Sequence, residues 1–262
     1  MNAYRTVLVY SGAATQVAKL VTLSARLAAA QGAAVDALCP PDGVDCDALR
    51  RLLSQAGAPG TCRALGEGAA ALIEHTRGAD LLVLSQPYFE SSQVPGLPFA
   101  SQLLVGASCP LLFVPRPAEL GTRCASRVLV AWDGGRESAR ALRDALPLLQ
   151  RADSVAVYAY GSPQGAAAHS LAHACEYLRR HGVEPRHAVQ RMGDADYARG
   201  GTMTPTLLDA SVGELLLSDA ADLDADLLVM GAYGHSPTQE LVLGGVTRSL
   251  LSSMTLPVLM SH

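Results

Sequence analysis

The sequence contains an internal repeat, and this repeat limits the folds that the chain can adopt. Ala79-Asp-Leu-Leu-Val-Leu84 matches Ala225-Asp-Leu-Leu-Val-Met230, and Ser108-Cys-Pro-Leu-Leu-Phe113 matches Thr255-Leu-Pro-Val-Leu-Met260. Arg127-Val-Leu-Val-Ala-Trp132 likewise matches the stretch that begins at Arg5, so that these two arginines align. A length of 262 residues allows two domains of ordinary size. The repeat therefore predicts two similar domains in tandem.

Each copy alternates apolar runs with helical patterns. The expected strands are 6–10, 34–38, 61–65, 80–84, 110–114, 127–132, 154–158, 184–189, 226–230 and 257–260. The expected helices are 15–31, 46–55, 68–76, 99–106, 137–149, 166–180, 207–220 and one that starts near 246. Buried strands alternating with helices predict a parallel sheet covered on both faces. We therefore expect an α/β chain of two doubly wound, five-stranded domains, residues 1–116 and 127–262, joined by a linker rich in proline.

Charge and hydropathy exclude several classes of partner. The net charge is −4, no basic run appears, and Lys19 is the single lysine, whereas binding to the nucleic-acid backbone needs clustered Lys and Arg. No apolar run approaches the length that spans a bilayer, and the first residues do not resemble a secretion signal. These features predict a cytoplasmic protein that binds neither nucleic acid nor a membrane.

Six cysteines are scattered along the chain without a C-x-x-C pair. Their spacing does not match a zinc site, and in a chain without a secretion signal we expect reduced thiols and no metal. His169 and His173 lie four residues apart on one expected helix, with Cys175 nearby. Two histidines without a third aligned ligand are more often surface residues than metal ligands.

A glycine-rich stretch follows the expected strand 226–230. It contains Gly231, Gly234, Gly244 and Gly245, and the last of these leads into the helix start Val246-Thr247. Glycines let a backbone approach a ligand closely, and the free N–H groups of a helix N-terminus suit an anion. The stretch therefore predicts a phosphate-binding loop. The alternative is that the glycines only shape a turn.

This pattern resembles the universal stress protein family. Its nucleotide-binding members carry Gly, two residues, Gly, nine residues, Gly and then Ser or Thr, which Gly231, Gly234 and Gly244 match; Gly245 replaces the Ser or Thr. Leu256-Pro-Val-Leu-Met260 resembles the family's last strand. The resemblance covers nearly the whole chain and is weaker in the first half. It implies the family's fold, which is similar to that of adenine nucleotide alpha hydrolases, and an adenine-nucleotide site in the second domain.

Asp133 matches the acidic residue with which the family contacts the adenine end of the nucleotide. Its alternative role is to cap the helix that starts near Arg136, and both roles are compatible. The first half lacks the matching residues. Ser11 or Gly12, depending on the alignment, stands in the place of Asp133, while Ser85 and Tyr88 stand where Gly231 and Gly234 align. Pro95 and Pro98 remove N–H donors. We predict that this half has no nucleotide site of the family type.

The resemblance implies a stress-response protein that binds ATP, with or without Mg²⁺, through Asp133, Gly231, Gly234 and residues 244–247. Binding should be weak or absent, since Gly245 supplies no hydroxyl. No general base, nucleophile or metal set stands out, which favours binding and regulation over turnover. A slow ATPase and a protein-interaction module with a relic site are the alternatives. The family also implies that the two domains pair as a pseudo-dimer, with a homodimer as a further possibility.

Overall fold

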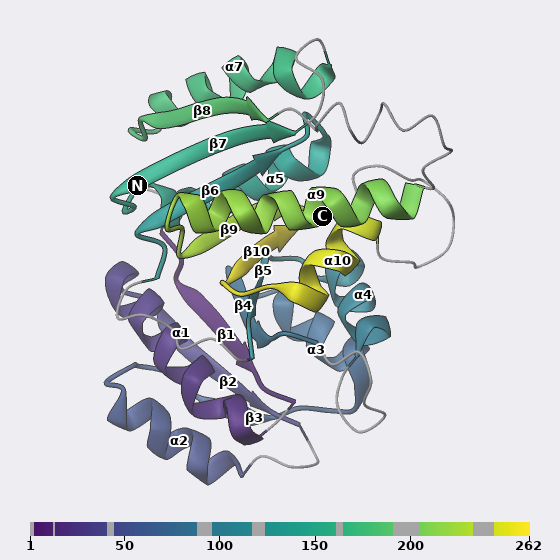
Figure 1. Cartoon of the computed structure of the whole chain (residues 1–262). Coiled ribbons are helices and arrows are strands. Elements are labelled where there is room, and N and C mark those ends of the chain that lie inside the picture. The colour runs from purple at the N-terminus through teal and green to yellow at the C-terminus, as the bar shows by residue number, and fades with distance from the viewer. Residues whose placement is uncertain are drawn as a thin grey trace. The chain divides into compact units, whose positions relative to one another are not determined.

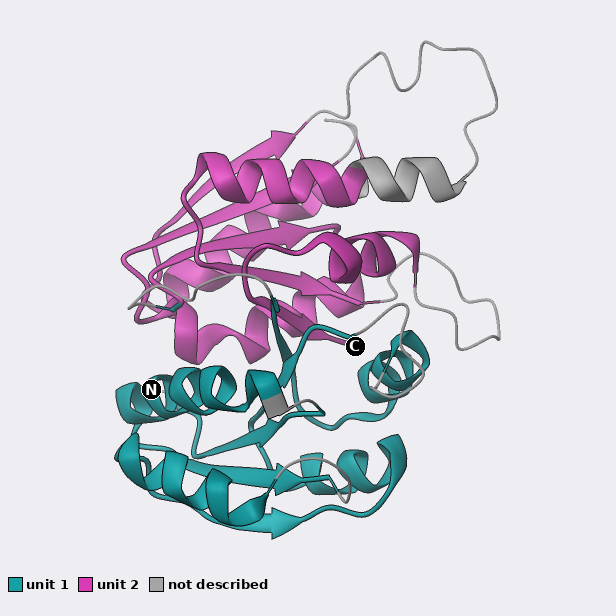
Figure 2. Ribbon diagram, turned by 60° about the horizontal axis from the view of Figure 1, so that its bottom comes forward, with its two compact units in different colours: residues 1–124 teal, residues 125–262 magenta. Residues whose placement is uncertain are grey.

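The computed structural model describes residues 3–12, 14–40, 45–87, 96–116, 124–160, 165–190, 205–232 and 244–262. The chain divides into two compact units, residues 1–124 and 125–262 (Figure 2). Figure 1 labels most of the helices and strands of both units. Within each unit the strands are parallel and the helices cover the two faces of the sheet, so the predicted α/β class with doubly wound sheets is confirmed.

Unit 1 contains a sheet in the order β3-β2-β1-β4-β5. Its strands are β1 (Thr6–Tyr10), β2 (Ala34–Cys39), β3 (Cys62–Ala64), β4 (Leu81–Ser85) and β5 (Leu111–Val114). Its helices are the short 3-10 helix η1 (Ala14–Gln16), α1 (Val17–Gln31), α2 (Cys46–Gln55), α3 (Gly68–Thr76) and α4 (Leu97–Gly106). The central strands are buried on both faces, as the continuous apolar runs predict: Leu81, Leu82 and Val83 are fully buried.

Unit 2 repeats this topology, with the strand order β10-β9-β6-β7-β8. Its strands are β6 (Arg127–Trp132), β7 (Ser154–Tyr160), β8 (Pro185–Gln190), β9 (Leu227–Gly231) and β10 (Val258–Ser261). Its helices are α5 (Arg136–Asp144), α6 (Leu146–Leu149), α7 (Ala166–Arg180), α9 (Pro205–Asp222) and α10 (Gly245–Ser253). In both units the strand order reverses between the first and the fourth strand of the unit, which are neighbours in the sheet.

The expected helix over 137–149 is two helices in the structure. α5 ends at Asp144, and α6 begins at Leu146 with Pro147 in its first turn. Proline has no N–H to donate, and its ring clashes with the carbonyl of the residue four positions before it. A continuous helix is therefore broken at this point, which the apolar periodicity alone did not indicate. Among the described residues, no helix is long and apolar enough to cross a bilayer.

Candidate functional site

The strand order of unit 2 reverses between β6 and β9. From β6 the chain continues to β7 and β8 on one side, whereas β9 and β10 lie on the other. The register pairs Val130 with Val229, so the ends of β6 and β9 lie at the same level. Ligands of open α/β sheets bind outside the carboxyl ends of the strands at such a reversal. Asp133, which follows β6, and Gly231, which ends β9, therefore lie on adjacent strand ends at this edge.

Asp133 shapes the turn between β6 and α5. Its Oδ1 accepts a hydrogen bond of 2.7 Å from the backbone N–H of Gly135, and Gly134 between them has a φ of 78°. The N-cap of α5 is Gly135, so the expectation that Asp133 itself caps this helix is wrong by position. The side chain is half-buried, and its Oδ2 makes no hydrogen bond to any residue that the structure describes. One carboxylate oxygen thus remains for a ligand.

Gly231 is a glycine for reasons of packing. A Cβ at this position would lie 2.5 Å from the backbone nitrogen of Ser138 and 2.8 Å from the Cβ of Glu137, both in the first turn of α5. Backbone atoms cannot give way as a flexible side chain does. The requirement for glycine at the end of β9 therefore comes from contact with α5, whether or not a ligand also approaches here.

The N-terminus of α10 carries backbone N–H groups that have no partner among the described residues. The first bond of the helix runs from the N–H of Arg248 to the carbonyl of Gly244 at 2.9 Å, which leaves the N–H groups of Gly245, Val246 and Thr247 without a carbonyl partner in the helix. The N-cap of α10 is Gly244, which has no side chain that could accept from these N–H groups. The positive end of the helix dipole lies at this turn and favours an anion.

The first turn of α10 lies at the same edge of the sheet as Asp133. β9 and β10 are parallel neighbours, so the helix that connects them starts at the carboxyl end of β9 and returns to the amino end of β10. The side chain of Thr247 is buried, at 3 % exposure. We therefore expect its backbone N–H, rather than its hydroxyl, to be available to a ligand. Gly234 lies outside the described residues, within 233–243.

Two aspartates fix the correspondence between the units. Asp80 in unit 1 and Asp226 in unit 2 each accept two successive backbone N–H groups at 2.7–3.0 Å, those of Arg5 and Thr6 and those of Ser126 and Arg127. Thr6 is therefore equivalent to Arg127, and the sequence alignment of Arg5 with Arg127 is wrong by one residue. With this register Gly12 stands in the place of Asp133, which decides between the two residues that the sequence left open.

The first unit lacks the anion-binding parts of the second. Because Asp80 corresponds to Asp226, Ser85 stands where unit 2 has Gly231. The backbone N–H of Leu82 donates to the carbonyl of Pro110, and that of Leu228 donates to the carbonyl of Pro257, each at 3.0 Å. Pro110 and Pro257 are therefore equivalent, and so are the helices that precede them, α4 and α10. Counting back from these prolines places Pro98 where unit 2 has Gly245. Proline has no N–H, so the first turn of α4 loses a donor that α10 keeps.

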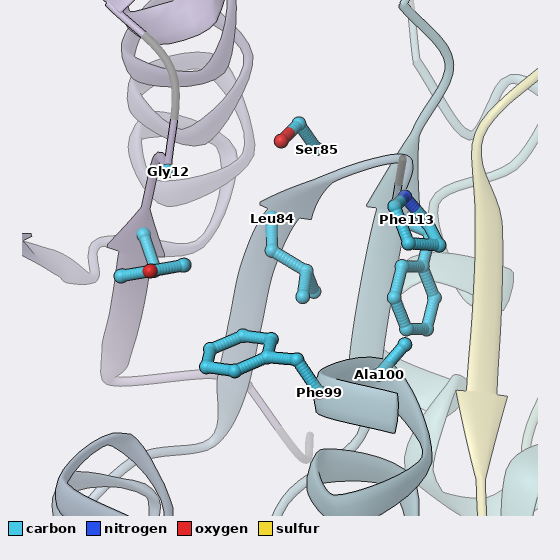
Figure 3. Close-up of a pocket in the computed structure, with 8 residues that line it drawn as sticks. Gly12, Leu84, Ser85, Phe99, Ala100 and Phe113 are labelled. Atoms are coloured by element: carbon cyan, nitrogen blue, oxygen red, sulfur yellow. The ribbon is translucent and has the colours of Figure 1, made fainter. Parts of the chain in front are cut away.

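Aromatic side chains fill the reversal point of unit 1. Tyr10 ends β1 and Phe99 lies in the first turn of α4, and their rings stack with the centroids 5.6 Å apart. A small, mainly apolar pocket remains there (Figure 3), lined by Tyr10, Gly12, Leu84, Ser85, Pro87, Phe99, Ala100 and Phe113. None of these lining residues carries a formal charge at neutral pH. A nucleotide bound here would find neither a cation for its phosphates nor an acidic side chain for its base. Tyr88, which stands where Gly234 aligns, and Pro95, which removes an N–H donor, lie outside the described residues.

A buried hydrogen-bonded group that the sequence did not indicate lies at the ends of β7 and β8. Asp219 of α9 accepts a hydrogen bond of 2.8 Å from the hydroxyl of Tyr160 and one of 3.1 Å from the side-chain amide of Gln190. Burial raises the pKa of Asp219, while the bond from Tyr160 opposes this; burial and Asp219 also raise the pKa of Tyr160. Both carboxylate oxygens are bonded, so this group holds α9 to the sheet. Its three residues are far apart in the sequence and match no motif.

The expectation of six reduced cysteines is wrong for one pair. Cys39 and Cys46 form a disulfide in the structure, and Cys62 lies beside them. Spacing along the chain did not show that the end of β2, the start of α2 and the start of β3 meet in space. His169 and His173 are exposed on α7, as expected of surface residues, whereas Cys175 is buried.

Comparisons with known proteins support the sequence resemblance. The sequence model described as "Universal stress protein family" matches residues 125–262, which is more than half of the chain. The fold is similar to that of a universal stress protein from Archaeoglobus fulgidus, with a TM-score of 0.70, 14 % identity and 97 % of each chain covered. It is also similar to a putative universal stress protein from Pseudomonas aeruginosa, with a TM-score of 0.62, 17 % identity and coverage of 99 % and 93 %. No curated protein matches the chain.

Proposed function

Because the chain belongs to the universal stress protein family as a tandem, two-domain member, we propose that unit 2 binds an adenine nucleotide. The ligand is ATP, with or without Mg²⁺, at the carboxyl edge of the unit 2 sheet. The first turn of α10 carries this proposal, because its three N–H groups have no partner among the described residues and lie at the edge where the strand order reverses.

Each end of the proposed site has its own role. The N–H groups of Gly245, Val246 and Thr247 bind the phosphates, and the helix dipole adds a favourable field. The unbonded Oδ2 of Asp133 accepts a hydrogen bond from the adenine amino group or a ribose hydroxyl. Gly231 keeps the end of β9 against α5, and this contact positions the turn that holds Asp133.

Weak binding follows from the absence of a side-chain donor at Gly245. A charge-assisted hydrogen bond to phosphate contributes roughly 1.5–3 kcal/mol, so its absence weakens binding by about tenfold or more. Gly245 is the first residue of α10, and its φ is not positive, unlike that of five other glycines in the described residues. A serine therefore fits this backbone conformation without strain, and Gly245→Ser should tighten binding.

Calorimetric titration with ATP and Mg²⁺ tests the proposal. A Cβ at Gly244 would meet no atom within 4 Å, so there is space for a side chain at this position, and Gly244→Val places methyl groups beside the helix end. We expect weak binding by wild type, binding about tenfold tighter by Gly245→Ser, and none by Gly244→Val. The matched control is Gly78→Val in unit 1, whose Cβ also meets nothing within 4 Å.

The titration and an assay of phosphate release separate the alternative functions. If wild type and Gly245→Ser are both folded and neither shows heat of binding at millimolar ATP, the site is a relic. A protein-interaction role is then the remaining alternative. Steady release of phosphate that Gly244→Val abolishes would instead identify a slow ATPase.

The family likeness also supports two proposals about the whole protein, a cytoplasmic location and a pairing of the two domains. If the domains pair within one chain, an isolated 125–262 fragment lacks its partner and should form dimers in sedimentation velocity, whereas the full chain should not.

A further inference from the structure

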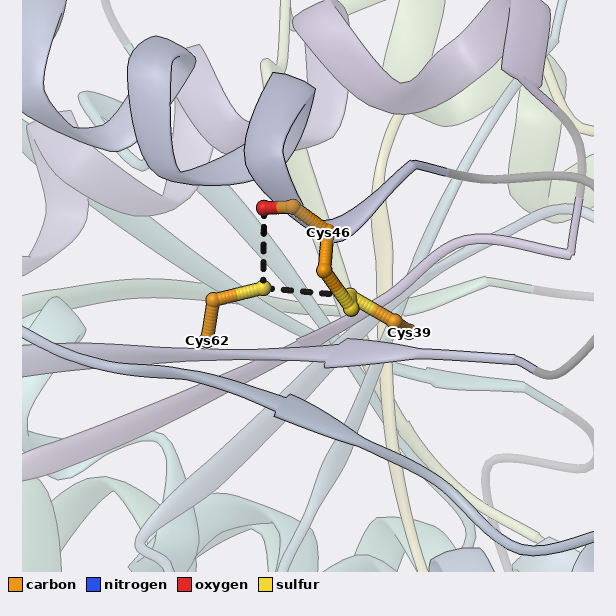
Figure 4. Close-up of side chains that lie close together, drawn as sticks. All are labelled: Cys39, Cys46 and Cys62. Carbon is orange, nitrogen blue, oxygen red and sulfur yellow. Dashed lines mark hydrogen bonds between the residues drawn. A yellow bond between two sulfur atoms is a disulfide. The ribbon is translucent and has the colours of Figure 1, made fainter.

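Three cysteines from separate elements of unit 1 converge on one point (Figure 4). Cys39 is the last residue of β2, Cys46 the first of α2 and Cys62 the first of β3. Their three sulfur atoms lie within 4.8 Å of one another. The register explains part of this convergence: Ala37 pairs with Cys62, and Ala37 and Cys39 project from the same face of β2. Cys62 therefore shares a face with Cys39.

The cluster contains a disulfide and an adjacent thiol. Cys39 and Cys46 are bonded, with their Cα atoms 5.8 Å apart. The sulfur of Cys62 lies 3.0 Å from that of Cys39 and 3.4 Å from the carbonyl oxygen of Cys46. Thiol–disulfide exchange requires a third sulfur in contact with one sulfur of the disulfide. The sulfur of Cys39 is bonded to that of Cys46 and is in contact with that of Cys62.

Burial gives the three sulfurs different roles. Cys39 is 2 % exposed, whereas Cys46 and Cys62 are half-buried. Reagents from solvent therefore reach Cys46 and Cys62 before they reach Cys39. Burial is the main cause that raises the pKa of the Cys62 thiol; Arg50 opposes the shift, and Asp47 and Asp45 add to it. Cys62 thus tends to stay protonated beside the disulfide, as a resting thiol.

The helix dipole favours a sulfur anion at Cys46. This residue is the first of α2, a helix of ten residues, and the positive end of the dipole lies there, whereas the carboxylates of Asp45, which caps the helix, and of Asp47 oppose the dipole. A stabilised thiolate is a good leaving group in exchange and a good nucleophile towards oxidants. The helix position is a second feature, independent of the contact among the sulfurs, that suits this cluster to redox chemistry.

We propose that Cys39, Cys46 and Cys62 form a hydroperoxide-reactive thiol site in which one disulfide can move between two partners of Cys39. The thiolate of Cys46 attacks a hydroperoxide, the O–O bond breaks, and a sulfenic acid and an alcohol (water, from hydrogen peroxide) form. The thiol of Cys39 then attacks the sulfenic sulfur, and the Cys39–Cys46 disulfide forms with loss of water. The peroxide is the two-electron oxidant.

Exchange follows without any further oxidant. Cys62 first gives its proton to solvent, and its thiolate then attacks the sulfur of Cys39. The Cys39–Cys62 bond forms, the Cys39–Cys46 bond breaks, and its electron pair leaves on Cys46 as a thiolate. Before the exchange the disulfide ties β2 to α2, and after it the disulfide ties β2 to β3. The exchange therefore releases α2 from a covalent tie and exposes the reactive Cys46 again.

The two disulfides give different tryptic products, which makes the test direct. Cleavage after Arg26, Arg50, Arg51 and Arg63 places Cys39 and Cys46 in the peptide 27–50 and Cys62 in the peptide 52–63. The reduced full-length protein is treated with one equivalent of hydrogen peroxide, quenched with acid at several times, alkylated and digested. Mass spectrometry then separates a loop within 27–50 from a cross-link between the two peptides.

In wild type we expect the loop to appear first and the cross-link to grow at its expense. Cys62→Ser should give the loop alone, and Cys46→Ser should oxidise at least tenfold more slowly, because it removes the first nucleophile. Cys124→Ser, which changes another half-buried cysteine of the same unit, should behave as wild type. A wild-type loop that never yields the cross-link, or equal oxidation rates in Cys46→Ser and wild type, would overturn the proposal. So would a reduced protein that retains one zinc ion per chain in native mass spectrometry and resists alkylation at all three cysteines.

Discussion

Gly231 has no room for a side chain at the end of β9. Its Cβ would lie 2.5 Å from the nitrogen of Ser138 in the backbone of α5, so Gly231→Ala forces the strand and the helix apart. Overpacking of this kind costs about 1–3 kcal/mol of unfolding free energy. Urea unfolding should show this loss, whereas Gly78→Ala, which places a Cβ in open space, should stay within about 0.5 kcal/mol of wild type. Equal stability of the two variants would show that the contact with α5 does not require glycine.

The same residue shows the limit of a motif at this scale. The sequence predicted Gly231 as part of a phosphate-binding loop, with a purely structural role for the glycines as the alternative. The structure supplies a contact with α5 that requires glycine without a ligand. The spacing was informative because the turn after β6 and the end of β9 must pack together. The physical cause involves Ser138, which is distant in sequence, and no local pattern could have shown it.

Single elements were predicted from the sequence with small errors at their ends. Apolar runs identified the strands, since buried parallel strands are apolar on both faces. The expected helix 137–149 failed at Pro147, and the alignment of β1 with β6 was shifted by one residue. The sequence could not show this shift, because the apolar residues of β1 and β6 match about equally well in either alignment. Only the bonds of Asp80 and Asp226 to the backbone of the neighbouring strand decide it.

These two aspartates should stabilise equivalent places in the two units. Each accepts two backbone N–H groups near the start of a central strand, and an alanine leaves both donors without this partner. We expect Asp80→Ala and Asp226→Ala each to lower the unfolding free energy by about 1–3 kcal/mol in urea titrations. Glu176→Ala, which breaks an exposed ion pair with Arg180 on α7, should cost less than about 0.5 kcal/mol. If one aspartate variant is as mild as Glu176→Ala while the other is not, the two positions are not energetically equivalent.

The whole molecule combines two copies of one topology with different residues at the same edge. Unit 2 keeps Asp133, Gly231 and a helix start with free N–H groups, whereas unit 1 has Gly12, Ser85 and Pro98 at the equivalent places. The sequence predicted this asymmetry because glycine, proline and aspartate act through local chemistry. It could not predict the cysteine cluster or the group around Asp219, because both depend on which distant segments the sheet brings together.

Hydrogen–deuterium exchange of the full chain with and without ATP and Mg²⁺ tests the central claim most directly. Bound phosphates would occupy the free N–H groups at the start of α10 and slow their exchange. We predict slower exchange in peptides that cover 244–250 and 131–136, and unchanged exchange in peptides that cover 97–103, the equivalent turn of unit 1. Protection of 97–103, or unchanged exchange at 244–250 with ATP at saturating concentration, would contradict the assignment of the nucleotide site to unit 2.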